Sequence, residues 1–485
     1  MLIDVTKKGY TTMLLPKKIA AVSLAVLLAG CGDDNNDIPV TTPPPPPAAP
    51  TPSEILTSTI EQAANGSGIA SFTFPASDDL ANIPQDPNNP LTAEKVVLGQ
   101  MLYHETAIST EGVNGDRNGT WSCASCHHAA AGFKAGIPQG IGEGGSDFGA
   151  TGAARVLATG FDKSSPDPTL VPDVQPVTSP AVLNVAYQEV MLWNGQFGAQ
   201  VDGIVNAGLA TDVLATPGTP KAENARNFGG VEIQAVAGQA VHRLRLKEDS
   251  VLQTNQTYID MYDAAFPNGY DDQVEGAALA IAAFERTILA NEAPFQRWLN
   301  GEADALGADE IAGATLFFGK AGCADCHRGP GLSSEVGATE DEIFFAQGFA
   351  DFDINNPQIT GGVGDADSRG RGGFTREVED NYKFKIAQLY NLKDTNVFGH
   401  GASFENVRDV VAYKNAGVSQ KILPAGVLDP RFQPLGLTET EIDQLTMFLE
   451  ESLYDPNLSR YVPTSLPTGA CLVVGDDASR DDVGC

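Results

Sequence analysis

The motif Cys-Ala-Ser-Cys-His at residues 123–127 returns as Cys-Ala-Asp-Cys-His at residues 323–327. Cys-x-x-Cys-His is the attachment signature of c-type haem, because two thiols at this spacing bind the haem while the adjacent histidine ligates the iron. Two copies therefore predict two covalently bound haems. The predicted attachment cysteines and proximal iron ligands are Cys123, Cys126, His127, Cys323, Cys326 and His327.

Two other chemistries use cysteine pairs. A zinc site built from the four thiols leaves the histidine after each pair unexplained, and a thioredoxin-like site needs one pair and no histidine. Of the seven cysteines in the chain, three lie outside the two motifs. Cys471 and Cys485 predict a disulfide in an oxidising compartment, the alternative being two free thiols in a frayed tail.

Helical patterns precede both motifs. Apolar residues gather on one face of residues 92–103 and, less clearly, of residues 311–318. A longer helical pattern covers residues 274–299, and Thr438 and Glu441 form a capping box before another apolar helix. Alternating strand patterns are scarce, and long segments rich in Gly, Pro and Asp connect the helices.

We therefore predict a mainly α fold. Two cytochrome c-like helical lobes, residues 72–300 and 301–485, would each carry one covalent haem, with long loops between the helices. Ordered structure is expected to begin near Phe72. His128, next to a predicted iron ligand, is expected at the surface.

The N-terminus has the pattern of an export signal. Two lysines and a short apolar stretch lead into Leu-Leu-Ala-Gly at residues 27–30 and then Cys31. This resembles a lipobox, so residues 1–30 are predicted to be removed and Cys31 to be lipidated, the alternative being an ordinary signal peptide. Residues 31–71, with five consecutive prolines, predict a disordered tether. The expected location is the periplasm, with a lipid anchor in a membrane. The outer membrane is favoured over the inner one because no Asp directly follows Cys31.

Composition narrows the class of partner. The chain has 30 basic and 62 acidic side chains, a net charge of −32, which argues against nucleic acid or an anionic membrane surface as a partner. Hydrophobic residues make up 42% of the chain, enough for a folded body, but no apolar run reaches the roughly 18 residues of a membrane-spanning helix. Membrane contact is expected only through the lipid anchor.

Three further blocks lie in a recognisable order around the haem motifs. They are Leu98–Glu105, Ser179–Asn184 with Leu192–Gly195, and Phe384–Asn391 with Gly399–Gly401. With these blocks the chain resembles the bacterial di-haem cytochrome c peroxidase and MauG superfamily from about Asn89 to Tyr461. It departs from the family pattern at Asn194, Ala387 and Tyr390, where Asp, Pro and Arg are usual. The resemblance implies a C-terminal haem that accepts electrons and an N-terminal haem that meets hydrogen peroxide.

The resemblance also suggests residues around the first haem. Glu232 corresponds to a catalytic glutamate, a distal acid and base whose pKa burial could raise; its alternative is a surface glutamate. Gln234 is a weaker candidate for the same pocket. Trp193 matches an electron relay between the haems, with plain packing as its alternative. Glu143 occupies the slot where many family members carry a histidine that caps the iron, so this haem is expected to be open to peroxide without prior reduction.

The surroundings of the second haem are less determined. The family methionine ligand would fall at Lys414, with Tyr413 beside it, and His400 or no protein ligand are further alternatives. The lack of a thioether ligand should lower this haem's potential. Thr395 fits a family calcium site between the lobes, but Thr178 stands where an Asn is usual.

Three functions remain open on the sequence alone. The first is reduction of hydrogen peroxide with electrons from a small cytochrome or cupredoxin. The second is MauG-like oxidation of a protein or organic substrate, and the third is a non-enzymatic di-haem electron carrier. An open iron position next to an acid would argue against the third.

Overall fold

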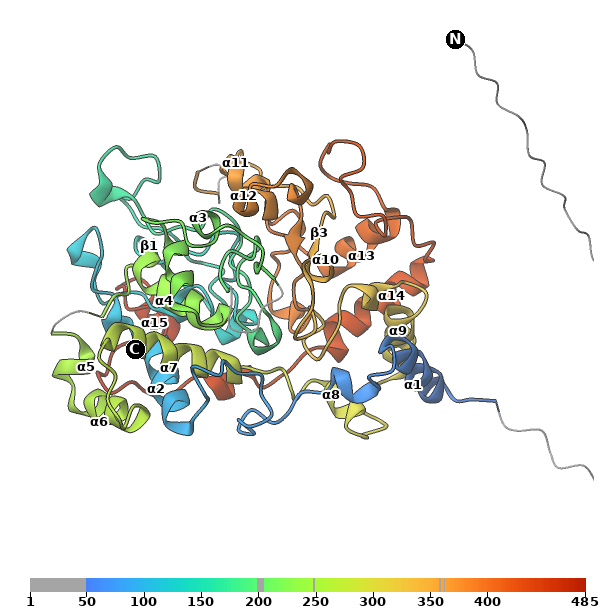
Figure 1. Cartoon of the computed structure of the whole chain (residues 1–485), viewed down its shortest axis with the longest axis horizontal. Coiled ribbons are helices and arrows are strands. Elements are labelled where there is room, and N and C mark those ends of the chain that lie inside the picture. Colours follow the sequence, from blue (N-terminus) through green and yellow to red (C-terminus); the bar gives the residue numbers. More distant parts are fainter. Residues whose placement is uncertain (1–48, 199–204, 247–248, 357–358, 362) are drawn as a thin grey trace, which may run out of the picture. The chain divides into compact units, whose positions relative to one another are not determined.

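Helices carry most of the regular structure in the computed structural model, which describes residues 49–198, 205–246, 249–356, 359–361 and 363–485 (Figure 1). Two short antiparallel pairs are the only sheets in this part of the chain: β1 (Gly145–Ser146) with β2 (Val156–Leu157), and β3 (Phe344–Phe345) with β4 (Phe384–Lys385). Gly145 faces Leu157, and Phe344 faces Lys385. The predicted mainly α class with long loops is confirmed.

The helices have the following bounds: α1 Pro52–Ala63, α2 Ala93–His104, α3 Thr211–Leu214, α4 Gly230–Val241, α5 Val251–Thr254, α6 Gln256–Ala265, α7 Gln273–Thr287, α8 Pro294–Leu299, α9 Ala308–Phe318, α10 Glu340–Ile343, α11 Asp365–Ser368, α12 Arg371–Thr375, α13 Val407–Ala416, α14 Glu439–Met447 and α15 Arg480–Val483. A π-turn continues α14 at Phe448–Ser452. The single helix expected over residues 274–299 is in fact two helices, because α7 ends at Thr287 and α8 starts at Pro294. Proline has no amide proton to donate to the preceding turn, so it is found at the start of a helix and not in its interior.

The helix that precedes each haem motif packs closely on a partner helix. A Cβ on Gly99 of α2 would lie 1.9 Å from the Ala280 carbonyl oxygen of α7, and one on Gly313 of α9 would lie 2.0 Å from the Gln444 carbonyl oxygen of α14. Only glycine permits these approaches. The same device in both halves supports two related lobes, and Figure 1 shows both helix pairs side by side.

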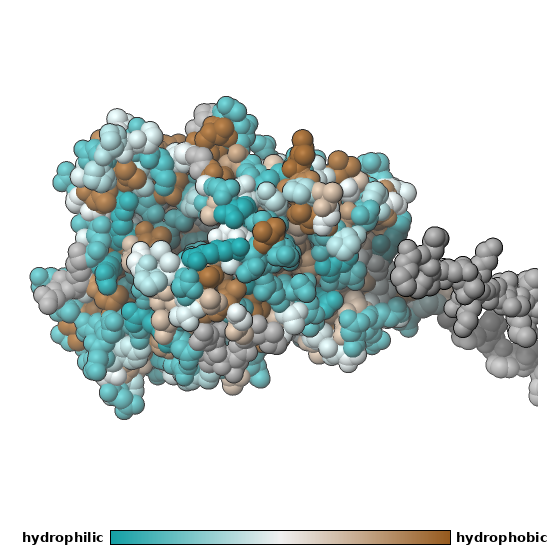
Figure 2. Space-filling model, turned by 45° about the horizontal axis from the view of Figure 1, so that its top comes forward, coloured by the Kyte–Doolittle hydropathy of each residue, from teal (hydrophilic) through white to brown (hydrophobic). Residues whose placement is uncertain are grey.

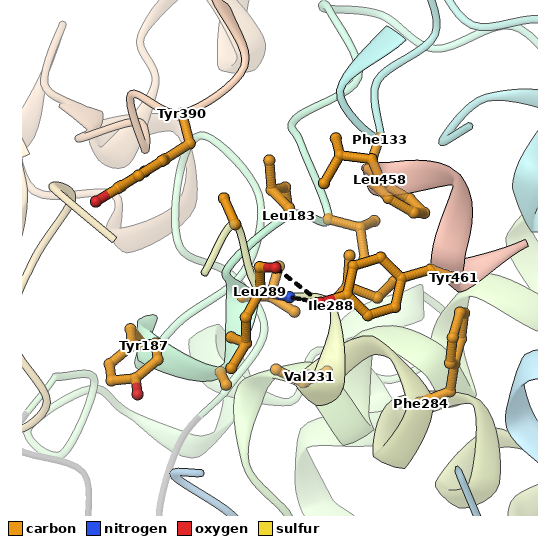
Figure 3. Close-up of a cluster of buried hydrophobic side chains, with 14 of the residues drawn as sticks. Phe133, Leu183, Tyr187, Val231, Phe284, Ile288, Leu289, Tyr390, Leu458 and Tyr461 are labelled. Carbon is orange, nitrogen blue, oxygen red and sulfur yellow. Dashed lines mark hydrogen bonds between the residues drawn. The ribbon is translucent and has the colours of Figure 1, made fainter. Parts of the chain in front are cut away.

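One hydrophobic core runs through residues of both halves. Figure 3 shows Phe133, Leu183 and Phe284 of the first half with Tyr390 and Tyr461 of the second. The Tyr461 hydroxyl donates to the Leu289 carbonyl oxygen at 2.7 Å and accepts from the Leu289 amide at 3.0 Å. The lobes therefore share a buried interface within the compact unit Pro50–Cys485.

The ends of this unit are exchanged between the lobes. Helix α1 packs against α9 of the second lobe, and its Leu56 and Ile60 are fully buried. Residues 468–485 instead lie on the first lobe, where Thr468 donates to Glu105 and Val474 pairs with Trp121. Both ends of the compact unit thus pack on the opposite half of the chain, and the lobe boundaries at residues 72, 300 and 485 stay a prediction.

Helix α1 also corrects the expected start of ordered structure near Phe72. Thr51 and Glu54 form a capping box, and Pro52 occupies the first turn, where its missing amide proton is not needed. The predicted tether therefore extends at most to Thr51. The predicted signal peptide, the lipidation site Cys31 and residues 31–48 lie outside the described residues. No helix in the described part of the chain is long and apolar enough to cross a bilayer.

Candidate haem sites and their surroundings

The second Cys-x-x-Cys-His motif lines a cavity of about 320 Å³, within the roughly 300–1,000 Å³ of cofactor sites. Cys323, Cys326 and His327 all face it. The Cys323 carbonyl oxygen accepts the amide of His327 at 2.9 Å, which folds the motif into one tight turn. His327 Nδ1 lies 2.8 Å from the Leu332 carbonyl oxygen, so its other ring nitrogen is free to ligate iron. Burial lowers the pKa of His327 to about 4, so the ring is neutral, as a ligand must be.

The first motif folds in the same way. The Cys123 carbonyl oxygen accepts the His127 amide at 3.1 Å, and Tyr103 donates its hydroxyl to the His127 carbonyl oxygen. Burial lowers the pKa of His127 to about 4, and its Nδ1 is buried without a hydrogen-bond partner among the described atoms. The four motif cysteines are free thiols. Both motifs therefore fit a covalent haem with a neutral proximal histidine.

Lys414, on α13, reaches the second haem cavity. Its ammonium donates to Gln347 Oε1 at 2.7 Å and lies 4.7 Å from the ring centre of Phe349 and 5.4 Å from that of Phe432. Burial lowers the pKa of Lys414 to about 8. Tyr413 does not line the cavity and instead donates its hydroxyl to the Gln347 carbonyl oxygen at 2.6 Å. The geometry favours Lys414 over Tyr413 as the group that faces the second haem.

His400 lines the same cavity but is held by other groups. Its ring stacks on Phe384 at 3.7 Å between centroids, and its Nε2 lies 3.0 Å from Asp351 Oδ1. Lys421 also pairs with Asp351, at 2.7 Å. These contacts favour a structural role for His400 over iron ligation.

Trp193 lies where the two sites meet. Its indole lines the second cavity and donates to the Thr178 carbonyl oxygen at 2.8 Å. The segment that follows Thr178 approaches both sites: a Cβ on Gly140 would lie 2.6 Å from the Ser179 hydroxyl and 2.9 Å from Cys126 Sγ, and the next residue, Pro180, lines the second cavity. Residues 178–180 thus lie between Cys126 of the first motif, Trp193 and the second cavity.

Glu232 lies buried near the start of α4. Its carboxylate accepts two hydrogen bonds from Arg286 of α7, at 2.8 and 2.6 Å, and one from Asn89 at 3.4 Å. Burial alone would raise the pKa of Glu232, but the ion pair with Arg286 outweighs it and the pKa falls below its ordinary value. The expectation of a surface glutamate is excluded, and that of a raised pKa is wrong: Glu232 is an ionised carboxylate that can accept a proton.

Glu285, next to Arg286, is a second buried carboxyl that sequence reasoning missed. Burial first, and then the negative charge of Glu232, raise the pKa of Glu285 to about 8. An ionised Glu285 would in turn raise the pKa of Cys123 in the first haem motif. The available signal was a Glu-Arg pair inside the alanine-rich run of α7, where a charged residue needs a buried partner.

The protonated state of Glu285 gives a testable pH dependence. The unfolded chain releases this proton near pH 4.5 and the folded chain near pH 8, so rising pH favours unfolding by up to about 1.4 kcal/mol per pH unit between these values. Relative to Glu285→Gln, the wild-type protein should lose thermal stability from pH 5 to pH 8. The exposed control Glu61→Gln should track the wild type, and equal melting temperatures of Glu285→Gln and wild type at every pH would contradict the prediction.

Gln234 and Glu143 occupy different surroundings. The Gln234 amide lies 3.5 Å from where a Cβ on Gly238 would be, on a less buried face of α4 than Glu232. Glu143 is fully buried, accepts the amides of Val113 and Asn114 at 3.0 and 2.8 Å, and pairs with Arg243. It is therefore held by residues of two other segments of the chain.

The calcium site remains a prediction. The Thr395 hydroxyl accepts the Val397 amide at 3.2 Å, and the Thr178 hydroxyl donates to the Gly399 carbonyl oxygen at 3.0 Å. In the described part of the chain, no group of three or more His, Cys, Asp or Glu side chains could hold a metal ion.

Cys471 and Cys485 form a disulfide, as the sequence predicts. His128, expected at the surface, is 3% exposed and packs edge-on against Phe148 at 4.8 Å between ring centroids. That expectation is wrong because the long loop after the first motif folds back over it.

The chain is similar to several known proteins. Residues 93–304 match the family described as di-haem cytochrome c peroxidase. The cytochrome-c peroxidase IdrP1 of Denitromonas iodatirespirans is 29% identical over 395 residues, 78% of this chain and 86% of that protein. The methylamine utilization protein MauG of Methylorubrum extorquens is 26% identical over 403 residues, 80% of this chain and 90% of that protein. A solved MauG-like protein associated with microbial copper homeostasis is 22% identical with a TM-score of 0.49, covering 79% of this chain and 94% of that one.

Proposed function

Because the chain belongs to the di-haem cytochrome c peroxidase and MauG family of oxidoreductases, we propose that it reduces hydrogen peroxide to water with electrons from a small redox protein. The observation that carries this proposal is the placement of residues 178–180 between Cys126 of the first motif, Trp193 and the second cavity. Two haem sites joined in this way suit a reaction that needs two electrons delivered to one place. The donor would be a small cytochrome c or a cupredoxin.

The residues of each site would divide the work. His127 and His327 would hold the two haem irons, which supply electron exchange and, at the first site, a position for peroxide. Glu232 is the proposed proton acceptor, because Arg286 keeps its carboxylate ionised inside the protein. It would take a proton from one peroxide oxygen and return it to the other. Gln234, on the same helix, is a weaker candidate for contact with peroxide.

Glu143 supports an iron position that is open without prior reduction. A carboxylate already bound to Arg243 and to two backbone amides is not free to cap the iron. We therefore expect a high-spin ferric first haem. An open position beside a proton acceptor also argues for an enzyme over a simple electron carrier.

The proposed location is the periplasm, where a lipid on Cys31 would anchor the protein to a membrane. The outer membrane is favoured over the inner one. The face seen in Figure 2 is largely hydrophilic, and acidic side chains outnumber basic ones by 32 in the whole chain. Such a surface suits a basic electron donor, although charges steer only over about 8 Å at physiological salt.

Lys414 favours the MauG-like alternative, oxidation of a protein or organic substrate. The second cavity presents this amine, and no methionine lies between Met261 and Met447. A second haem without a thioether ligand should have a lower potential, and would be less suited to a high-potential donor.

Turnover of reduced cytochrome c separates these functions. The peroxidase should oxidise reduced cytochrome c catalytically when hydrogen peroxide is added, with water as product. A protein that consumes peroxide stoichiometrically without oxidising cytochrome c or a reduced cupredoxin would favour MauG-like chemistry. Two low-spin haems that do not react with peroxide would favour a non-enzymatic electron carrier.

Trp193→Phe should slow electron transfer between the haems. The variant keeps an aromatic ring but loses the oxidisable indole and its hydrogen bond to Thr178. We expect a roughly tenfold or greater slowing, about 1.4 kcal/mol in barrier height, with both haems retained. Stopped-flow reduction measures the step, and Trp298→Phe, on α8, serves as control because that indole bonds only Ser53 among the described residues. Unchanged transfer in Trp193→Phe would refute the relay.

A further inference from the structure

The last residues of the chain form a strap on the first haem motif. We define the C-terminal strap as residues 468–485. The Val473 carbonyl oxygen accepts hydrogen bonds from the hydroxyls of Ser122, at 3.1 Å, and Ser125, at 2.6 Å. Ser125 is inside the motif itself, and the disulfide between Cys471 and Cys485 closes the strap. The end of the chain thus holds the segment to which the first haem attaches.

The strap also delivers a carboxylate to a buried arginine. Asp476 Oδ2 lies 3.4 Å from Arg155 Nη1, and the two side chains are only 3% and 2% exposed. Ser479 donates to the same Asp476 oxygen at 2.8 Å. Asp476 is the only acidic side chain in the described part of the chain that forms an ion pair with Arg155, so the charge of the guanidinium depends on the strap for compensation.

Arg155 in turn holds the glycine-rich loop that covers the first motif. Its Nε donates to the Ile141 carbonyl oxygen at 2.8 Å and its Nη2 to that of Gly142 at 3.1 Å. The next residue back, Gly140, lies so close to the motif that a Cβ there would be 2.9 Å from Cys126 Sγ. A Cβ on Gly145 would be 2.2 Å from the guanidinium. The same short loop therefore contacts the arginine and approaches the haem attachment point.

The charge of Arg155 is felt at that point. Burial raises the pKa of Cys126, and the positive charge of Arg155 lowers it in part. A negative charge on Cys126 would in turn raise the pKa of Arg155. Were Cys126 bonded to a haem, the cation of Arg155 would act on that haem from a buried site, where charges interact more strongly than in water.

We propose that Arg155 and Asp476 are a positioning pair that sets the reduction potential of the first haem. Arg155 fixes the 140–145 loop against the haem attachment segment, and Asp476 would compensate the cation that otherwise would stabilise the reduced, less positive haem. The inference rests on the attachment of haem at residues 123–127 in the proposed function. It gives the C-terminal strap a role in the chemistry as well as in folding.

Single substitutions should shift the potential in opposite directions. Asp476→Asn keeps the size of the side chain but leaves Arg155 uncompensated, so the midpoint potential of the first haem should rise. Arg155→Gln leaves Asp476 uncompensated, and the potential should fall. The double variant should return toward the wild-type value, because the coupling between the two charges is lost. Spectroelectrochemical titration of the di-haem protein measures all three.

The matched control is the neighbouring Asp477→Asn, whose side chain is fully exposed and, among the described residues, forms an ion pair only with Arg480. Asp477→Asn should leave the midpoint potential of the first haem unchanged. Asp476→Glu, which keeps the negative charge, should have a potential close to that of the wild type. Mass spectrometry verifies that each variant carries two haems. If Arg155→Gln does not fold, the comparison of Asp476→Asn with Asp476→Glu decides alone.

An unchanged potential in Asp476→Asn would overturn the proposal, even if thermal stability fell, because the pair would then be only a scaffold. A potential that rises in Asp476→Asn, in a protein that never reduces peroxide, would leave the pair standing and refute the proposed peroxidase. The two failures are therefore distinguishable.

Discussion

Glu232→Gln should reduce peroxide turnover by roughly 10²–10⁴-fold, the usual contribution of a positioned proton-transfer group. The amide keeps the shape of the carboxylate and can still contact Arg286, but it cannot accept a proton. Loss of one partner of a buried ion pair typically costs about 3–5 kcal/mol, so kcat is referred to protein that retains both haems. The control is Glu223→Gln, a partly exposed carboxylate paired with Arg226.

Arg286→Gln separates a proton acceptor from a structural ion pair. This variant keeps the Glu232 carboxyl but removes the charge that lowers its pKa, so that burial should raise the pKa. Activity that requires the ionised carboxylate would then be lost at a higher pH than in the wild type, and the acid limb of kcat/KM should move upward. Equal losses in both variants, with no displacement of the pH profile, would show that the pair serves only the fold.

The haem motifs and the capped helices could be predicted because their signals are local. Two cysteines and a histidine within five residues define an attachment site without knowledge of the rest of the chain. The capping box at Thr438 and Glu441 starts α14 where the sequence predicts it. Helix α1 carries the same signal at Thr51 and Glu54, but the proline run before it and Pro52 inside it made a tether the simpler interpretation.

The electrostatic surroundings of the site could not be predicted, because they join residues far apart in sequence. Glu232 and Arg286 are 54 positions apart, and Arg155 and Asp476 are 321 apart. Neither pair has a spacing rule, since each depends on how two helices or a strap and a loop meet. The resemblance pointed to Glu232, but only the structure shows the cation that reverses the expected direction of its pKa shift.

The exchanged ends of the chain have the same cause. An even split at residue 300 follows from the repeat of the haem motif, which gives each half one attachment site. Nothing in the local pattern of residues 52–63 or 468–485 says which lobe they cover. The choice is made by burial of Leu56 and Ile60 in α1 and by the hydrogen bonds of Val473, at opposite ends of the chain.

Lys414→Met should raise the midpoint potential of the second haem and produce the absorption of a His/Met haem. The side chain at this position already faces the cavity that holds Cys323 and His327, so a thioether there can reach the iron. Axial ligands tune haem potentials over about 0.8 V, and a rise on the order of 0.1 V is expected. Potentiometric titration followed in the near-infrared region measures both changes.

Lys414→Gln distinguishes ligand replacement from loss of charge. It removes the amine without supplying a thioether, and loss of a nearby cation should, if anything, lower the potential, so a rise confined to Lys414→Met identifies the new ligand. Tyr413→Phe should leave the spectrum unchanged, because that hydroxyl bonds the Gln347 backbone outside the cavity. A His/Met spectrum in the wild-type protein would show that a methionine elsewhere in the chain ligates the iron. In that case Lys414 on α13 would not occupy the ligand position. A higher potential in Lys414→Met should also speed electron uptake from a high-potential donor, because the driving force for the first transfer increases. The lysine would then be the residue that favours the MauG-like alternative, while peroxide reduction stays the proposed function.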